Sequence, residues 1–154
     1  MKNISYEKAL HLLAAYCSKS ERCIADISKK MILWNLSEGD QIKILDRLRH
    51  EKFLDEQRFA YAFTHDKATY NKWGYHKIKY ELKKKNIPDP IISEALKKIN
   101  PQQSKETLRY LLNKKIKTTK GKNDYEIKQK LIRFALSRGY FSNDIEEILS
   151  SLLK

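Results

Sequence analysis

The sequence predicts an all-α protein built from tandem three-helix repeats, and three observations lead to that fold class. Only four glycines and three prolines occur in 154 residues, while helix-favouring lysine, leucine, isoleucine, glutamate and alanine are abundant. Apolar side chains recur at intervals of three and four residues, as on one face of a helix, and not at intervals of two. The same combination of core and helix-ending residues returns about every fifty residues, as in a helical-repeat protein.

Short polar side chains mark where the helices are expected to begin, because their oxygen atoms can accept hydrogen bonds from the first free N–H groups of a helix. The candidate N-caps or first-turn residues are Ser5, Ser20, Ser37, Asp55, Asp89, Ser104, Asn123 and Ser142. Asn35, Asn86 and Gly139 are candidate helix ends, since asparagine and glycine tolerate the left-handed backbone that often follows a helix. These signals predict about nine helices with short connections.

Three segments repeat one pattern, in which two core residues are followed by a helix terminator, an apolar residue, a capping cluster and another amphipathic helix. The corresponding residues are Ile27, Met31, Asn35, Leu36 and Leu45, then Ile78, Leu82, Asn86, Ile87 and Leu96, and, after one extra helical turn, Ile127, Leu131, Gly139, Tyr140 and Leu149. One such triplet has little core of its own, so stacking against a neighbour would stabilise it. The alternative is that any helix-turn-helix sequence gives this spacing by chance.

Two positions mark the boundaries between the expected repeats. Pro101 disfavours helix at the residue before it, and Asp55 can cap a new helix whose Phe59 and Phe63 face the core. We therefore predict three helix-turn-helix-like repeats, at residues 1–54, 55–100 and 101–154.

The composition indicates a negatively charged partner. The formal net charge is +13. The excess positive side chains repel one another within the fold, and such an excess ordinarily attracts a polyanion such as nucleic acid. A membrane surface is the rival interpretation, although the apolar runs are far too short to span a bilayer.

The N-terminus lacks a signal-peptide pattern, so a cytoplasmic protein is expected, with Cys17 and Cys23 as reduced thiols.

Most of the net positive charge falls in two segments. Residues 67–85 hold seven lysines against the single acid Glu81, interleaved with aromatic residues, and residues 105–122 hold seven basic residues against Glu106. Ammonium groups can neutralise phosphates while aromatic rings stack on unpaired bases or cover an apolar pocket of a partner. The plain alternative is a solvated lysine face that only keeps a helical protein soluble, but the clustering favours binding.

The helix expected at residues 74–85 separates a core face from binding faces. Tyr75, Ile78 and Leu82 form its predicted buried stripe, which leaves the lysines on the remaining faces. The residues expected to bind are Lys72, Trp73, Lys77, Lys79, Tyr80, Lys83, Lys84, Arg109, Lys114, Lys115, Lys117, Lys120 and Lys122.

Signals of catalysis are missing from the sequence. It has no glycine-rich phosphate loop and no Ser or Cys in an activating motif, and its four histidines lack metal-ligand spacing. We therefore expect neither an enzyme nor a small-molecule substrate, cofactor or metal.

The middle of the chain contains a distinctive motif, the stretch Phe-Leu-Asp-Glu-Gln-Arg-Phe-Ala at residues 53–60. This stretch is similar to Gly-Tyr-Leu-Asp-Asp-x-Arg-Phe-Ala, a motif of the RecX family of recombination regulators. Residues 74–87 match the pattern Gly-x-x-x-Ile-x-x-Glu-Leu-x-x-Lys-Gly-Ile, with Asn86 in place of the second glycine and Lys52 in place of an earlier turn glycine. The resemblance covers nearly the whole chain and is sharpest over residues 45–99.

The resemblance implies an elongated, curved array of three-helix units that lodges in the groove of a RecA filament on single-stranded DNA. Such proteins depress ATP hydrolysis, strand exchange and co-protease activity, and so affect recombination, DNA repair and the SOS response. A monomer with RecA and single-stranded DNA as partners is therefore expected, and double-stranded DNA stays open as a further ligand.

Two other functions remain as alternatives. One is a helix-turn-helix protein that inserts a helix into a major groove, although residues 91–99 and 144–152 offer few basic or amide side chains to base edges. The other is a non-specific single-strand-binding protein that acts without RecA.

Overall fold

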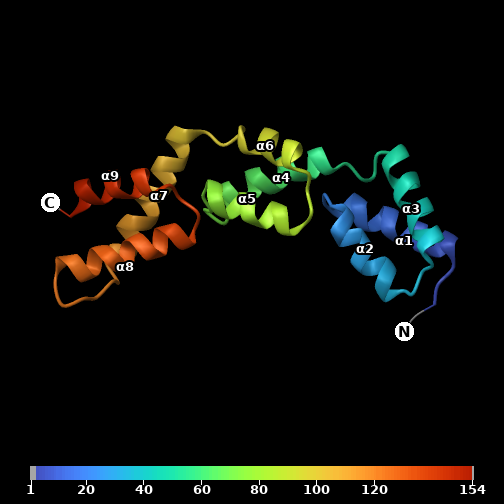
Figure 1. Cartoon of the computed structure of the whole chain (residues 1–154), viewed down its shortest axis with the longest axis horizontal. Helices are drawn as coiled ribbons and strands as arrows, with labels where there is room; N and C mark the ends of the chain where they lie inside the picture. Colours follow the sequence, from blue (N-terminus) through green and yellow to red (C-terminus); the bar gives the residue numbers. More distant parts are fainter. Residues whose placement is uncertain (1–2, 154) are drawn as a thin grey trace. The chain divides into compact units, whose positions relative to one another are not determined.

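The fold consists of helices joined by short connections. A computed structural model describes residues 3–153, and among them it contains nine helices and no strand (Figure 1). The helices are α1 (Tyr6–Lys19), α2 (Ile24–Leu33), α3 (Glu38–His50), α4 (Glu56–Thr69), α5 (Tyr75–Lys84), α6 (Asp89–Leu96), α7 (Pro101–Ile116), α8 (Asp124–Ser137) and α9 (Ser142–Leu152). The predicted all-α fold class and the predicted number of helices are both confirmed for the described residues.

Backbone packing groups the chain into two compact units. The N-terminal unit comprises the residues up to Ala62 together with Leu82–Ile92, and the C-terminal unit comprises Phe63–Glu81 together with the residues from Ser93 on. This grouping divides α4, α5 and α6 between the units. The repeat boundaries at residues 54 and 100 remain a prediction.

Each unit has an apolar core supplied by the predicted helix faces. The N-terminal unit buries Ala9, Leu13, Cys17, Ile27, Met31, Leu36, Ile44, Leu48 and Leu54 in one cluster. In the C-terminal unit, where α7, α8 and α9 pack as a three-helix bundle, the cluster contains Leu108, Leu112, Leu131, Ala135, Tyr140, Ile145, Ile148 and Leu149 (Figure 1). Each fully buried Leu, Ile or Met contributes about 1.5–3 kcal/mol through the hydrophobic effect.

The helix starts follow the sequence signals with one exception. The side chains of Ser5, Ser37, Asp55 and Asn123 each accept a hydrogen bond from the backbone N–H three residues later. Asp89 and Ser142 are the first residues of α6 and α9, and Ser104 is the fourth residue of α7, which Asn100 caps. The expectation for Ser20 is wrong, because Ser20 ends α1 and Cys23 precedes α2.

The predicted helix ends are confirmed. Asn35, Asn86 and Gly139 have φ angles of 57°, 60° and 96°. At each helix end, the N–H of the terminating residue donates a hydrogen bond to the carbonyl three residues before it, as Asn35 does to Ile32. The N–H of the next residue donates to the carbonyl five residues before it, as Leu36 does to Met31. This Schellman arrangement satisfies helix-end carbonyls and turns the following apolar residue inward. Leu36, Ile87 and Tyr140 are accordingly buried.

Lys52 adopts the same left-handed conformation at the end of α3, with φ 64°. A left-handed residue with a side chain is strained by about 1–2 kcal/mol, whereas glycine is not, although glycine gains freedom in the unfolded chain. We expect Lys52→Gly to raise the free energy of unfolding by up to about 1 kcal/mol, measured by urea denaturation. Lys43→Gly, in the exposed interior of α3, should instead lower it by about 1 kcal/mol. A Lys52→Gly variant less stable than the parent would contradict this account.

The start of α2 is fixed by carboxylates within the N-terminal unit. The Asp26 carboxylate accepts hydrogen bonds from the Cys23 N–H and the Lys85 ammonium, each at 3.2 Å, and Glu56 accepts the Ile24 N–H at 3.1 Å. Burial opposes ionisation of Asp26, but the hydrogen bonds from Cys23 and Lys85 outweigh it and hold the pKa of this carboxyl below its usual range. Burial also raises the pKa of the Cys23 thiol to about 11, so this free cysteine is a protonated core residue at neutral pH.

Candidate nucleic-acid interface

The N-terminus of α5 is hydrogen-bonded to the C-terminus of α8 within the C-terminal unit. The Gly74 N–H donates to the Arg138 carbonyl at 2.7 Å, and the His76 N–H donates to the Gly139 carbonyl at 2.9 Å. The free amides of one helix thus meet the free carbonyls of another, which satisfies both and aligns their dipoles head to tail. We call this contact the α8–α5 joint.

The joint requires glycine on both sides. A Cβ atom on Gly74 would lie 2.6 Å from the Gly139 carbonyl oxygen, and a Cβ atom on Gly139 would lie 2.4 Å from the backbone nitrogen of Lys77. Tyr75 and His76 continue the contact by packing their rings against Phe141, with centroid distances of 5.2 and 4.8 Å. Of the predicted buried stripe, Ile78 and Leu82 are fully buried, whereas Tyr75 is only half-buried.

Lys72 is held in place by the same region. Its backbone is left-handed, with φ 57°, and its carbonyl accepts a 2.7 Å hydrogen bond from the Tyr140 hydroxyl. Tyr140 is only 2% exposed, and burial raises the pKa of its phenol well above the usual value. Tyr140 therefore remains a hydrogen-bond donor throughout the physiological pH range and anchors the short connection that carries Lys72.

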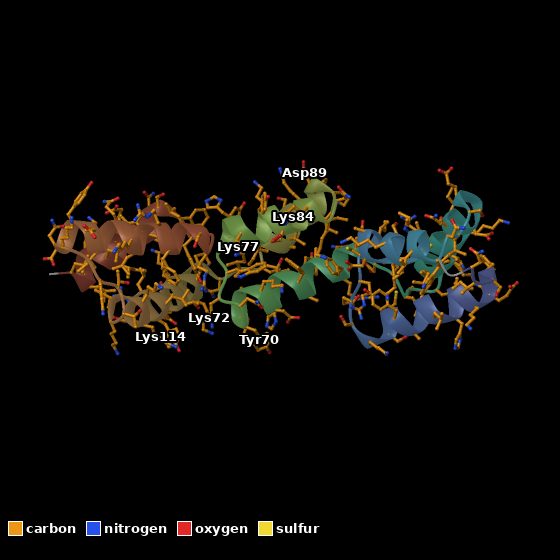
Figure 2. The ribbon with its side chains drawn as sticks, turned by 90° about the horizontal axis from the view of Figure 1, so that it is seen from below. Tyr70, Lys72, Lys77, Lys84, Asp89 and Lys114 are labelled. Atoms are coloured by element: carbon orange, nitrogen blue, oxygen red, sulfur yellow. The ribbon has the colours of Figure 1, made fainter. Side chains whose placement is uncertain are left out.

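Two predicted lysines from distant parts of the sequence converge on Tyr110 of α7. The Lys72 ammonium lies 5.8 Å and the Lys114 ammonium 5.4 Å from the centre of the Tyr110 ring. Figure 2 shows Lys72 and Lys114 on the same edge of the C-terminal unit, with Tyr70 also there and Lys77 toward the other edge. Tyr110 is 49% exposed, so the two cations lie beside an accessible aromatic residue.

A second cation–aromatic cluster forms around Trp73. The ammonium groups of Lys67 and Lys77 lie 4.9 and 4.7 Å from its ring centre, and Phe63 meets the ring edge-on at 6.3 Å. Trp73 is half-buried, so packing accounts for part of its surface. Trp73, in the connection before α5, and Lys77, on α5, therefore lie side by side.

The other predicted residues of α5 are accessible to different degrees. Tyr80 is 62% exposed, and the Lys79 ammonium lies 5.9 Å from the Tyr75 ring. Lys83 and Lys84 are exposed and belong to the N-terminal unit. Their role in binding stays a prediction.

The basic residues of the second predicted cluster lie along α7 and the connection that follows it. Arg109, Lys114, Lys115, Lys117, Lys120 and Lys122 are exposed. Lys115 lies over the Phe134 ring at 5.1 Å, and Arg138 lies over the same ring at 4.9 Å. Lys117 caps the C-terminus of α7, where a positive charge is favourable.

Two lysines of the basic segments form ion pairs with carboxylates of the protein and are therefore less available to a ligand. Lys85 pairs with Asp26, and Lys105 lies 3.9 Å from Asp144 and 3.5 Å from Glu147 of α9. The charge of a segment thus overstates the charge it offers to a ligand, because part of it is neutralised by carboxylates far away in the sequence.

Tyr110, Lys67, Gln103 and Thr107 were missed as candidates. Gln103, Thr107, Tyr110 and Lys114 follow one another at helical spacing on α7, opposite the buried Leu108 and Leu112, and that spacing is the signal that could have revealed Tyr110. The approach of Lys72 to Tyr110 had no signal in the sequence.

In the described part of the chain, no group of three or more histidine, cysteine or acidic side chains is placed to hold a metal ion. No helix in residues 3–153 combines the length and the apolar character needed to cross a membrane.

Tandem three-helix units with an exposed basic and aromatic surface define an all-α repeat protein. A family model described as the second three-helix domain of RecX matches residues 55–96, and one described as the third three-helix domain of RecX matches residues 102–149. The chain belongs to the RecX family of regulatory proteins, as its motifs predicted.

Individual relatives agree with this assignment. Regulatory protein RecX of Clostridium acetobutylicum is 32% identical over 97% of this chain and 70% of its own length. The protein of that name from Clostridium botulinum (strain Eklund 17B / Type B) is 31% identical over 88% of this chain, and that of Prosthecochloris aestuarii is 29% identical over 99% of both. The chain spans 62% of the Clostridium botulinum protein and 51% of the Clostridium tetani one, so it is shorter than several relatives.

Solved structures show the same fold. A crystal structure of regulatory protein RecX superposes with a TM-score of 0.87 at 23% identity, covering 94% of this chain and 73% of that one. RecX from Lactobacillus salivarius superposes with a TM-score of 0.82 at 20% identity, covering 96% of both chains. At these identities the likeness establishes the helical-repeat architecture alone.

Proposed function

We propose that this RecX-family chain binds RecA filaments on single-stranded DNA in the cytoplasm and lowers their ATPase, strand-exchange and co-protease activities. Membership of a family of regulatory proteins carries the proposal. The net charge of +13 supports a nucleoprotein target, since a filament formed on nucleic acid contains negatively charged phosphates.

The distribution of charge supports binding along a surface more than insertion of one reading helix. The closing helices α6 and α9 carry Asp89 and Glu94, and Asp144, Glu146 and Glu147, and no lysine or arginine falls within either helix. Such helices would be repelled by the phosphates that line a major groove. The basic residues expected to bind lie instead on α5, on α7 and in the connections before α5 and after α7.

The test measures ATP hydrolysis by RecA on circular single-stranded DNA while this protein is added. We expect inhibition at one chain per several RecA subunits, because a protein seated along a filament affects more than one subunit. If inhibition needs stoichiometric amounts and disappears with excess DNA, the protein only competes for single strands and the proposal fails.

A charge-matched pair of variants separates the predicted surface from general basicity. The triple variant Lys77→Ala, Lys79→Ala, Lys84→Ala and the control Lys19→Ala, Lys29→Ala, Lys43→Ala each remove three charges. We expect the first to weaken inhibition and to reduce the salt dependence of DNA binding by about 0.7 in slope for each phosphate that it no longer neutralises. Equal effects from both triples would show that net charge alone matters and that these lysines of α5 are not specific contacts.

A further inference from the structure

A hollow beside Tyr110 has the components of a site for one nucleotide. It is lined by Lys72, Gln103, Glu106, Thr107 and Tyr110, all of the C-terminal unit, and has a volume of about 340 Å³. That volume is at the small end of the range of about 300–1,000 Å³ found for ligand sites. The Lys114 ammonium lies 5.4 Å from the centre of the Tyr110 ring, which lines the hollow together with Lys72.

We propose that this Tyr110 hollow holds one nucleotide of single-stranded DNA, with the base stacked on Tyr110 and the flanking phosphates bound by Lys72 and Lys114. The inference rests on the proposed function, whose DNA component it assigns to named residues. An unpaired base can stack on an accessible ring whatever its identity, which suits a protein that follows a strand without reading its sequence.

The energies allow the lysines to exchange the ring for phosphate. A cation–aromatic contact at an exposed site is weaker than the stacking of a base on an aromatic ring. Moving Lys72 and Lys114 from the Tyr110 ring onto phosphates therefore uncovers the ring at a cost that stacking and ion pairing offset.

The polar lining gives the nucleotide a direction. Glu106, one turn before Tyr110, repels phosphate but can accept a hydrogen bond from the N–H groups on the Watson–Crick edge of a base. Gln103 and Thr107 add donors and acceptors on the same helix face. The base accordingly enters the hollow while the phosphates remain outside, near the ammonium groups.

Glu106 also weighs against an acidic peptide as the occupant. A carboxylate of such a peptide that entered the hollow would lie beside the Glu106 carboxylate, and like charges placed together disfavour association. A nucleotide avoids this conflict because its charge and its hydrogen-bonding edge lie at opposite ends.

The frame around the hollow is already in the binding geometry. Lys72 is carried by a connection that Tyr140 anchors through a 2.7 Å hydrogen bond, and Tyr110 projects from the core helix α7. Little ordering of the backbone is therefore required on binding, which reduces the entropic cost.

The test uses the full chain and a fluorescein-labelled oligothymidylate without RecA, with anisotropy as the readout. We expect Tyr110→Ala to weaken binding about tenfold with an unchanged salt slope, and Tyr110→Phe to bind like the parent. Lys72→Ala and Lys114→Ala should each reduce the salt slope by about 0.7. Tyr125→Ala is the matched control, since Tyr125 is a more exposed tyrosine of the same unit at 72%, and it should have no effect.

A second measurement identifies the contact directly. Irradiation of an oligonucleotide carrying 5-iodouracil should cross-link the α7 peptide that contains Tyr110, and mass spectrometry would locate the adduct. If Tyr110→Ala binds DNA normally and the adduct lies elsewhere, the hollow is not a nucleotide site, whatever happens to RecA.

Failure of the hollow and failure of the proposed function give different results. Loss of RecA inhibition in Tyr110→Ala with normal DNA binding would overturn the nucleotide assignment in favour of a protein contact, with the regulatory function intact. Tyr110-dependent DNA binding in a protein that leaves the RecA ATPase unchanged would support the hollow and overturn the regulatory proposal.

Discussion

Gly139→Ala should lower the free energy of unfolding by about 3 kcal/mol, measured by urea denaturation followed by circular dichroism. Two effects add. Alanine is strained at the φ angle of 96° that ends α8, and its Cβ atom would lie 2.4 Å from the Lys77 backbone nitrogen. Relief of that clash requires separation of α8 from α5, which breaks the hydrogen bonds from Gly74 and His76.

Gly39→Ala is the matched control for this experiment. Gly39 is the second residue of α3, and an added Cβ atom would meet nothing within 4 Å. Alanine has the higher helix propensity, so this variant should be more stable than the parent by up to about 1 kcal/mol. If Gly139→Ala were as stable as the parent, α8 and α5 would not meet closely at the joint.

Asp26→Ala should lower the free energy of unfolding by about 2 kcal/mol at neutral pH, because it removes a helix cap and one partner of a half-buried ion pair. The variant leaves the Cys23 N–H without its side-chain acceptor and the Lys85 ammonium without its carboxylate. Asp46→Ala is the control, since Asp46 is 71% exposed and pairs with Arg49 only at 3.8 Å. That change should stay within about 0.5 kcal/mol of the parent.

The contribution of Asp26 should depend on pH in a definite direction. The folded state holds the pKa of Asp26 below its ordinary value of 3.8, so the unfolded state binds a proton more readily. Its stabilisation is therefore complete above that value and is lost as pH falls through the lower, folded pKa. The stability gap between the parent and Asp26→Ala should be constant from about pH 5 to about pH 7 and should narrow below about pH 4. A gap that widened in acid would contradict the assignment.

The local parts of the fold could be predicted from the sequence because they depend on neighbouring residues. A terminator such as Asn35, Asn86 or Gly139 follows two core residues and precedes an apolar one, and helix capping needs only a span of a few residues. Ser20 does not cap a helix. The backbone N–H groups of Cys23 and Ile24, at the start of α2, donate instead to the carboxylates of Asp26 on α2 and Glu56 on α4. Capping by a distant carboxylate leaves no local pattern.

The candidate interface could be predicted only as a set of charges. Lysines 72 and 114 were both expected to bind, but their approach to one tyrosine depends on packing between segments remote in the sequence. The left-handed backbone of Lys72 is also not indicated by its residue type, because lysine has no preference for that conformation. Tyr110 was missed for the same reason, since an exposed aromatic residue becomes a candidate only when its neighbours are known.

The α8–α5 joint is made from peptide groups, which nearly every residue type supplies. It requires glycine at positions 74 and 139, where a side chain would clash, and a backbone N–H at positions 74 and 76 to donate the two hydrogen bonds. Exposed lysines on the surrounding surface can consequently be exchanged without removing the hydrogen bonds that join the two helices. The exposed lysines expected to bind a ligand and the peptide groups that hold α5 against α8 are thus different parts of the unit. Substitutions of those lysines should therefore change binding while the free energy of unfolding stays nearly the same.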